Sequence, residues 1–438
     1  MNNRGTIMSL QFIHAADLHI DSPLKGLTSK STTVAQKLRT ATRDAFAKLV
    51  DKAIEFNVAF VVIAGDIFDG EWDDTETGLW TNNQFKRLEE ASIPVFVVYG
   101  NHDKKNNILD NIGLPKNVKV FSDRAPERIL YPEDCQALGA RETEERIALT
   151  GQSYKTWKCN ENLAANYPNY EPERFNIGVL HTGLGGDSAT DYAPTSVETL
   201  LGKGYDYWAL GHQHKREVFL DDGARWIGYS GALQGRHINE AEPKGFYLVT
   251  VEDGKLACEP EFIRVDPFQW FRVEIDATGI EDEEELKALF YEKIEDAVDK
   301  ADGRYVAARV VFSGRTALFS ELHKCQEEDK FTDMFLYTLN SFQDKLWVEQ
   351  FQLRNLAPPV PEHFWNNNAY REIKQAVDAA TASVELGGKT PIDDLRKKLA
   401  SCKSLIQGDG DAGINVDDPE QLKLWYRQAL DIIANVLS

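Results

Sequence analysis

The sequence has few of the features that mark secreted, disulfide-stabilised or membrane proteins. Its five cysteines are widely scattered over 438 residues, are odd in number and form no CxxC pair. They are therefore expected to be reduced structural thiols, neither disulfides nor thiolate ligands of a metal. No apolar run approaches the length of about eighteen residues that suggests a membrane span, and no signal peptide precedes the first apolar run. We therefore expect a cytoplasmic protein without a membrane segment.

Positive charge is also scarce. Forty-nine Lys and Arg stand against seventy Asp and Glu, which gives a formal net charge of −21. A surface of this charge repels polyanions as a whole, which argues against a passive nucleic-acid-coating protein. It does not exclude a nuclease whose metal ions supply positive charge locally. The length suffices for two or three domains with a sizeable core.

What the sequence does contain is a set of apolar runs that each stop at a residue type able to bind a metal. Residues 59–63 predict a strand buried on both faces, and Gly65-Asp66 follows it. In open α/β sheets ligands bind at the carboxyl ends of strands, so Asp66 stands where a ligand-binding or catalytic residue is expected. Four further runs repeat the design: 10–16 before Asp17 and His19, 93–99 before Asn101 and His102, 175–180 before His181, and 205–210 before His212 and His214. Five such strand ends indicate a metal site.

The segments between the first three of these strands have helical periodicity. Residues 31–56 and 77–92 predict amphipathic helices, so the first hundred residues indicate strand–helix–strand units in a layered α/β domain. The expected inward residues are Ala41, Ala45, Leu49, Val50, Ala53 and Ile54 in the first helix, and Leu79, Phe85 and Leu88 in the second. Further short strands are predicted at 118–121, 147–150, 216–220, 225–229 and 245–251, with a helix at 195–202. Two halves of this kind would form a sandwich of two sheets.

Two local interpretations accompany this pattern. Asp17 and His19 are two residues apart, so in extended backbone their side chains point to the same side and reach one ion. His14, inside the first strand, is interpreted as a buried histidine with a hydrogen-bonded ring rather than as a ligand.

We expect three domains, at 8–266, 267–355 and 356–438. The second is a small β-α-β module with strands at 270–276 and 304–313 and a helix at 281–300. Arg304, Arg309 and Arg315 give it a basic edge, interpreted as solvated rather than as phosphate-binding. The third begins with a Pro-rich linker, followed by helices at 367–386 and 419–437. These helices pack on their own chain or dock a partner.

The candidate ligands combine carboxylate or amide oxygens with imidazole nitrogens, and include no thiolate. They are Asp17, His19, Asp66, Asn101, His181, His212 and His214. Such a set suits Mn²⁺, Fe²⁺ or Zn²⁺, and seven ligands are too many for one structural zinc. Two ions about 3.5–4 Å apart that share Asp66 would use them all, and His102 would remain as a general acid or as a donor to a developing oxyanion. This chemistry is phosphoester hydrolysis.

The order Asp-x-His, Gly-Asp-Ile-Phe-Asp, Gly-Asn-His-Asp, a single His and Gly-His-Gln-His over residues 10–230 resembles the calcineurin-like metallophosphoesterases. The first three motifs are most similar to those of the SbcD-type DNA repair exonucleases, in particular their YhaO-like branch. The resemblance implies an α/β (α+β) fold: a four-layer sandwich of two β-sheets flanked by helices, with a small β-α-β cap domain and C-terminal helices. It also implies two metal ions, with Mn²⁺ expected, DNA as substrate, and an SMC-like coiled-coil ATPase as partner of the C-terminal helices; a homodimer is compatible with it.

The resemblance assigns roles to individual residues. The first ion would be held by Asp17, His19, Asp66 and His214, and the second by Asp66, Asn101, His181 and His212. His102 would protonate the leaving group or steady the phosphate, and Asp69 has a catalytic role at a position where some nucleases of the group carry a histidine.

The leading functional hypothesis is a metal-dependent DNA nuclease, a 3′→5′ exonuclease and single-strand endonuclease that acts in DNA repair. The alternative is a phosphodiesterase or phosphatase for nucleotides or small phosphoesters, because the metal motifs are common to both. A non-enzymatic scaffold would need no complete set of ligands.

Overall fold

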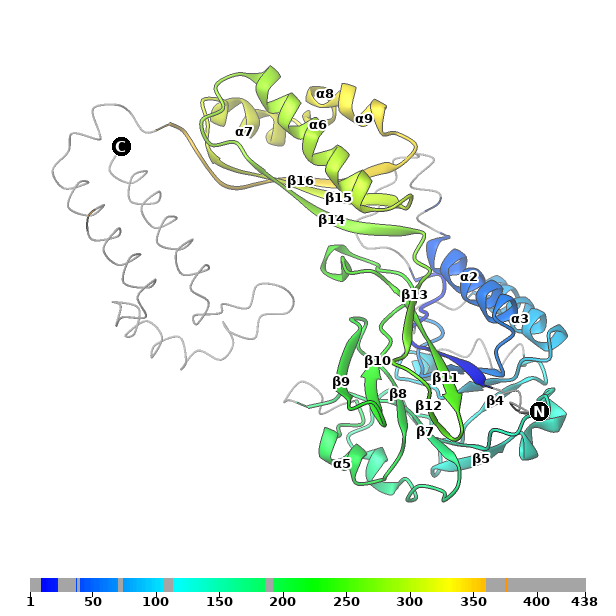
Figure 1. Cartoon of the computed structure of the whole chain (residues 1–438). Helices are drawn as coiled ribbons and strands as arrows, with labels where there is room; N and C mark the ends of the chain where they lie inside the picture. Colours follow the sequence, from blue (N-terminus) through cyan, green and yellow to red (C-terminus); the bar gives the residue numbers. More distant parts are fainter. Residues whose placement is uncertain are drawn as a thin grey trace, which may run out of the picture. The chain divides into compact units, whose positions relative to one another are not determined.

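The computed structural model describes residues 9–22, 37, 40–69, 74–105, 113–185, 192–359 and 375. The predicted helices at 367–386 and 419–437 lie outside the described residues apart from the single residue 375, and so does the end of the Pro-rich linker. The chain divides into two compact units (Figure 1). The first runs to Trp270 and includes Gly303–Ala307, and the second comprises Phe271–Asp302 and the chain from Ala308 onward.

The first unit contains two β-sheets. The seven-stranded sheet has the order β12-β11-β1-β2-β3-β4, with β13 paired to β11. Its strands are β1 (Leu10–Ala15), β2 (Phe60–Ile63), β3 (Val95–Val97), β4 (Val118–Val120), β11 (Gly245–Glu252), β12 (Lys255–Leu256) and β13 (Glu261–Arg264). The six-stranded sheet has the order β5-β6-β7-β8-β10-β9. Its strands are β5 (Glu127–Tyr131), β6 (Ile147–Gly151), β7 (Phe175–His181), β8 (Tyr207–Gly211), β9 (Glu217–Asp221) and β10 (Trp226–Tyr229).

Parallel pairing brings the motif-bearing strand ends to common edges. β1 pairs with β2, and β2 with β3, in parallel, while β7 pairs with β8 in the other sheet, again in parallel. Helices α2 (Ala41–Glu55) and α3 (Thr75–Glu90) connect the first three strands and lie side by side in Figure 1. Because parallel strands point their carboxyl ends the same way, the loops that follow β1, β2 and β3 are neighbours. The predicted strand–helix–strand units are confirmed.

The first unit is a sandwich of four layers. One apolar cluster joins α2 and α3 to the outer face of the seven-stranded sheet, with Phe46 and Leu88 among its members. A second cluster fills the space between the sheets, where the Phe12 and Phe60 rings stack at 5.1 Å. A third lies on the outer face of the six-stranded sheet under α5 (Val197–Leu201) and the short helix η3 (Leu163–Asn166). The predicted two-sheet sandwich flanked by helices is therefore the observed fold.

His14 lies inside this sandwich, as interpreted from the sequence. It is fully buried, with Nδ1 2.9 Å from the Tyr207 hydroxyl and Nε2 3.1 Å from the Leu210 carbonyl oxygen. Burial lowers the pKa of His14 to about 3, so the ring is neutral. Its two nitrogens join β1 to β8 across the two sheets.

Two predicted inward residues are wrong. Leu79 in α3 is 52% exposed, and Ile54 near the end of α2 is 36% exposed. The buried stripe of α3 passes through Gly78, Thr81, Phe85 and Leu88 at three- and four-residue spacing, and Leu79 lies off that stripe. The sequence pattern identified the helices correctly but assigned these two residues to the wrong face.

The third sheet has the order β14-β15-β16 and is formed by β14 (Phe268–Asp276), β15 (Tyr305–Arg315) and β16 (Leu346–Ala357). It belongs to the second unit except for the first three residues of β14 and of β15, which are assigned to the first unit. The predicted helix between the first two strands is α6 (Glu283–Lys300). β16 and the short helices α7 (Phe319–Glu327), α8 (Phe331–Met334) and α9 (Leu336–Ser341) were not predicted. Stacked rings of Phe312, Phe331, Phe335 and Phe351 tie them together.

The three arginines expected at a basic edge have partners within the chain. Arg309 pairs with Glu349 through contacts of 2.8 and 2.6 Å, and Arg304 approaches Asp266 at 3.2 Å. Arg315 donates to the Pro358 carbonyl oxygen at 3.0 Å. These pairings give the arginines structural roles. Among the helices of the described residues, none has the length and apolar character that a membrane crossing requires.

The two faces of α3 provide a matched test of the fold. Leu88→Ala is expected to lower the free energy of unfolding by about 2–5 kcal/mol, because it leaves a cavity in the cluster under the sheet. Leu79→Ala removes the same atoms from an exposed site and is expected to change the free energy of unfolding by less than about 0.5 kcal/mol. Urea unfolding of both variants measures the difference. Equal losses would contradict the assignment of the buried stripe.

Candidate metal centre

The loops that follow β1 and β2 lie against each other and carry the first candidate ligands. The backbone N–H of Asp17 donates to the Gly65 carbonyl at 3.0 Å, and that of His19 donates to the Asp66 carbonyl at 3.1 Å. Asp17, His19 and Asp66 all have positive φ, at 51°, 42° and 55°. The expectation of an extended Asp17–His19 backbone is therefore wrong: left-handed turns, tied to the neighbouring loop, direct these side chains.

Two glycines of the motifs allow a close approach between loops. A Cβ on Gly65 would lie 2.4 Å from the His181 Nδ1, and φ of Gly65 is 98°. A Cβ on Gly100 would lie 2.3 Å from the Asp66 Oδ1. Both contacts are far below van der Waals distance, so only glycine fits at either position.

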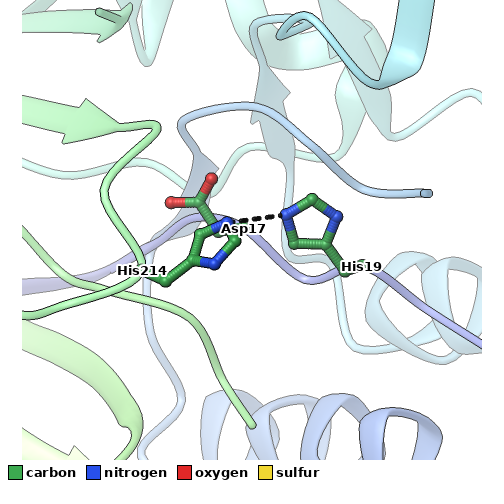
Figure 2. A group of neighbouring side chains, drawn as sticks. All are labelled: Asp17, His19 and His214. Carbon is green, nitrogen blue, oxygen red and sulfur yellow. Dashed lines mark hydrogen bonds between the residues drawn. The ribbon is translucent and has the colours of Figure 1, made fainter. Parts of the chain in front are cut away.

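One group of candidate ligands consists of Asp17, His19 and His214, drawn in Figure 2. Their donor atoms all lie within 4.8 Å of one another, and the Nε2 atoms of His19 and His214 are 3.1 Å apart. His214 Nδ1 is 2.8 Å from Glu240 Oε1 and 3.2 Å from Arg236 Nη2. The shorter contact with the carboxylate favours a proton on Nδ1, which leaves the Nε2 lone pair for the group. Two imidazole nitrogens and a buried carboxylate at this spacing match the ligand chemistry of a divalent transition metal.

A second group consists of Asp17, Asp66 and His181, all at most 1% exposed. The Ala64 carbonyl accepts from His181 Nδ1 at 2.9 Å, which leaves Nε2 to face the group. His181 Nε2 lies 3.4 Å from Asp66 Oδ2 and 3.0 Å from Asn101 Oδ1. All the residues of these two groups are candidate ligands from the sequence. The residue common to the two groups is Asp17, whereas the sequence analysis expected Asp66 to be shared.

The electrostatics of the cluster fit a cation. Burial raises the pKa of Asp17, and it lowers the pKa of His19 well below the usual value. Burial would also lower the pKa of His181, but the charges of Asp66 and Asp17 outweigh it and raise this pKa to about 9. Buried carboxylates thus hold a proton on His181 as their counter-charge, and divalent ions at these donors would supply that charge instead.

His212 takes a position at the margin of these two groups. Its ring packs on His181 at 5.3 Å and on Tyr192 at 4.4 Å, and its backbone N–H donates to Asp17 at 3.1 Å. Burial, with the nearby His181, lowers the pKa of His212 to about 3. A neutral ring is the form that binds metals.

His102 and Asp69 form a pair beside the groups. His102 Nδ1 is 3.1 Å from Asp69 Oδ1, its ring packs on His19 at 4.8 Å, and its backbone N–H donates to Asp66 Oδ1 at 2.9 Å. Burial opposes the charged form of His102, but the hydrogen bond to Asp69 and the charge of Asp66 raise its pKa. An imidazole that keeps a proton is suited to donate one. Asp69, 19% exposed as a side chain, also accepts from Ser22 and Arg236.

Sequence reasoning missed Asp103, which organises the loops. Its carboxylate accepts from the backbone N–H groups of Asp66, Ile67, Phe68 and Gly100 at 2.8–3.2 Å. Burial and the charge of Asp66 raise the pKa of Asp103 to about 6, against the lowering effect of these donors. Its place directly after His102 in the Gly-Asn-His-Asp motif was an available signal.

Glu240 and Arg236 were also missed. Glu240 is buried and accepts a hydrogen bond from His214. Burial favours the neutral acid, but the hydrogen bonds to His214 and His237 outweigh it. The pKa of Glu240 therefore falls below the usual range. Arg236 donates to Ser22 at 2.9 Å and to Asp69 at 3.2 Å. Neither stands at the end of an apolar run, so the sequence carried no comparable signal for them.

Comparisons with known proteins agree with this fold. The family model of the calcineurin-like phosphoesterases matches residues 10–216, and that of the middle domain of metallophosphoesterase YhaO matches residues 270–355. The uncharacterized metallophosphoesterase YhaO of Bacillus subtilis (strain 168) is 33% identical over 365 residues, which are 80% of this chain and 85% of that protein. The chain belongs to the calcineurin-like metallophosphoesterases, and among them to the family of YhaO.

More distant similarities extend beyond this family. The DNA double-strand break repair protein Mre11 of Methanopyrus kandleri is 25% identical over 64% of this chain and 62% of that protein. That of Sulfurisphaera tokodaii is 29% identical over 55% of this chain and 59% of that protein. A dimetal phosphatase from Danio rerio covers 58% of this chain and 99% of its own, with 12% identity and a TM-score of 0.35, too low to add to the family match.

Glu240 provides a test of the centre. Glu240→Ala is expected to weaken divalent-metal binding by about 10- to 100-fold, because His214 loses the partner that holds its proton on Nδ1. Isothermal titration with Mn²⁺ measures the affinity, and Glu240→Gln, which keeps an acceptor oxygen, is expected to lie in between. Glu284→Ala, at an exposed position of α6, is the control and should bind Mn²⁺ as the wild type does. An unchanged affinity of Glu240→Ala would refute this role.

Proposed function

We propose that this metallophosphoesterase is a Mn²⁺-dependent DNA nuclease, a 3′→5′ exonuclease and single-strand endonuclease that acts in DNA repair. The observation that carries the proposal is the position of His102. Its ring packs on His19 of one candidate ligand group, and its backbone N–H bonds to Asp66 of the other. A proton donor next to two groups of candidate metal ligands is an arrangement suited to phosphodiester hydrolysis.

The proposed ligands of the first ion are Asp17, His19, Asp66 and His214, and those of the second are Asp66, Asn101, His181 and His212. These residues would hold two divalent ions, proposed to be Mn²⁺, which when bound would supply a water of lowered pKa and positive charge for the phosphate. Asp69 accepts the Nδ1 proton of His102, so Nε2 is the nitrogen proposed to protonate the leaving oxygen. Arg236 and Ser22 in turn hold Asp69 in place.

DNA as the substrate class is supported by two observations. The Mre11 relatives are named as DNA double-strand break repair proteins, and their similarity covers more than half of this chain. The chain also carries a second compact unit, which the hydrolysis of a small ester does not need. We propose that residues 8–266 form the catalytic domain and residues 267–355 a cap that positions DNA. We further propose that residues 356–438 dock an SMC-like coiled-coil ATPase; a homodimer is compatible with this arrangement.

Hydrolysis assays test the proposal directly. Labelled single- and double-stranded oligonucleotides, and bis-p-nitrophenyl phosphate beside them, are incubated with wild type in Mn²⁺ or in EDTA. We expect Mn²⁺-dependent cleavage of the oligonucleotides that EDTA removes. His102→Ala is expected to lower kcat about 10²- to 10⁴-fold, because the proton donor is removed while the candidate ligands remain.

His323→Ala is the matched control, since this histidine lies on α7 of the second unit, and it should retain full activity. Hydrolysis of the small ester alone would assign the chain to the phosphodiesterases or phosphatases that act on small substrates. Oligonucleotide cleavage that persists in EDTA or in His102→Ala would exclude this site as its source.

A further inference from the structure

We infer that Trp157, flanked by Lys105 and Lys158, is a stacking platform for a base of a single-stranded polynucleotide at the margin of the metal centre. Trp157 is 45% exposed, although it is a large apolar side chain. The Lys158 Nζ lies 4.8 Å from the centre of its ring, and the Lys105 Nζ lies 5.2 Å from it. This inference rests on the proposed function and names the part of the substrate that Trp157 binds.

The platform is joined to the turn that carries His102. Lys105 ends the short helix η1 (Asp103–Lys105), and its backbone N–H donates to the His102 carbonyl at 3.0 Å. The Lys105 side chain therefore spans from this turn to the Trp157 ring. A base on Trp157 would therefore lie one lysine side chain away from the turn that carries His102.

The segment that carries Trp157 is anchored at both ends near candidate ligands. On one side, the Tyr154 N–H donates to the Tyr99 carbonyl at 2.9 Å, directly before Gly100 and Asn101. On the other side, Cys159 forms a parallel bridge with Tyr192, whose ring packs on His212. The exposed Trp157 ring thus projects from a segment whose two ends are hydrogen-bonded to chain segments beside the candidate ligands, so its position relative to them is fixed.

The local charge differs from that of the whole chain. The formal net charge is −21, yet the ammonium groups of the exposed Lys105 and Lys158 both lie over this ring. A polyanion that is repelled by the rest of the surface is attracted here. Lys104, in contrast, is paired with Asp123 at 3.2 Å, so it is held away from this role.

An exposed indole with two ammonium groups fits a nucleotide better than it fits a small ester. Bases stack on aromatic faces without sequence preference, and lysines pair with the flanking phosphates. A base that stacks on Trp157 would displace a lysine from the ring face, and the released ammonium would be free to pair with the backbone. A small phosphoester has no base to stack, so its hydrolysis should not depend on this residue.

Fluorescence anisotropy of a 5′-fluorescein single-stranded oligonucleotide, with Mn²⁺ present, measures binding in the His102→Ala background, where cleavage is suppressed. Trp157→Ala is expected to lower the affinity about 5- to 100-fold, and Trp157→Phe, which keeps a ring, by less. Lys105→Gln with Lys158→Gln is expected to reduce the slope of log affinity against log salt by about 0.7 for each phosphate that a lysine no longer neutralises. In the His102-intact enzyme, Trp157→Ala should hydrolyse bis-p-nitrophenyl phosphate at the wild-type rate.

Tyr170→Ala removes another exposed aromatic side chain of the first unit, 53% exposed, and should bind the oligonucleotide normally. Unchanged oligonucleotide affinity in Trp157→Ala would overturn the platform, as would an equal loss on both substrates, which indicates a structural role. If the wild type binds the oligonucleotide but does not cleave it, only the proposed nuclease function is contradicted. The affinities of the Trp157 variants would still test whether Trp157 binds a base. Absence of any oligonucleotide binding would overturn both.

Discussion

The arrangement of the site depends on the burial of two carboxylates. Asp17 and Asp66 are each 1% exposed and lie at the carboxyl ends of two adjacent parallel strands. Buried negative charge at this density requires compensation by protons, hydrogen-bond donors or cations. The chain supplies histidines and backbone N–H groups around both residues, and a neutral histidine also offers a ring-nitrogen lone pair that a divalent ion can use. The requirement for counter-charge and the capacity for metal binding are one property of the site.

The loops achieve this at a conformational cost. Asp17, His19 and Asp66 occupy left-handed backbone conformations that non-glycine residues seldom adopt. Asp103 offsets part of this cost, because four backbone N–H groups converge on its carboxylate. Glu240 fixes the proton of His214 from the far side. The candidate ligand side chains are therefore held in place by the chain itself, and such pre-organisation is typical of catalytic sites.

If the chain acts on a polyanion as proposed, its acidic surface needs local positive charge. Metal ions at the candidate ligands would supply it, and so would Lys105 and Lys158 beside Trp157. In contrast, the arginines of the second unit are used within the chain, as Arg309 with Glu349 illustrates. Recognition of a long substrate would then start at the margin of the centre, where the exposed ring adds contact area without adding negative charge.

The sequence by itself determined the strands, the connecting helices and the ligand-type residues that follow them, because buried parallel strands read as apolar runs and their carboxyl ends fall at one edge. It also identified His14 as structural. Only the tertiary structure decided which helix residues face inward, as Leu79 shows, and which residues support the site. Glu240 and Arg236 reach His214 and Asp69 from a loop after β10, and β16 completes its sheet far along the chain. Such contacts depend on packing between distant segments, which no local periodicity encodes.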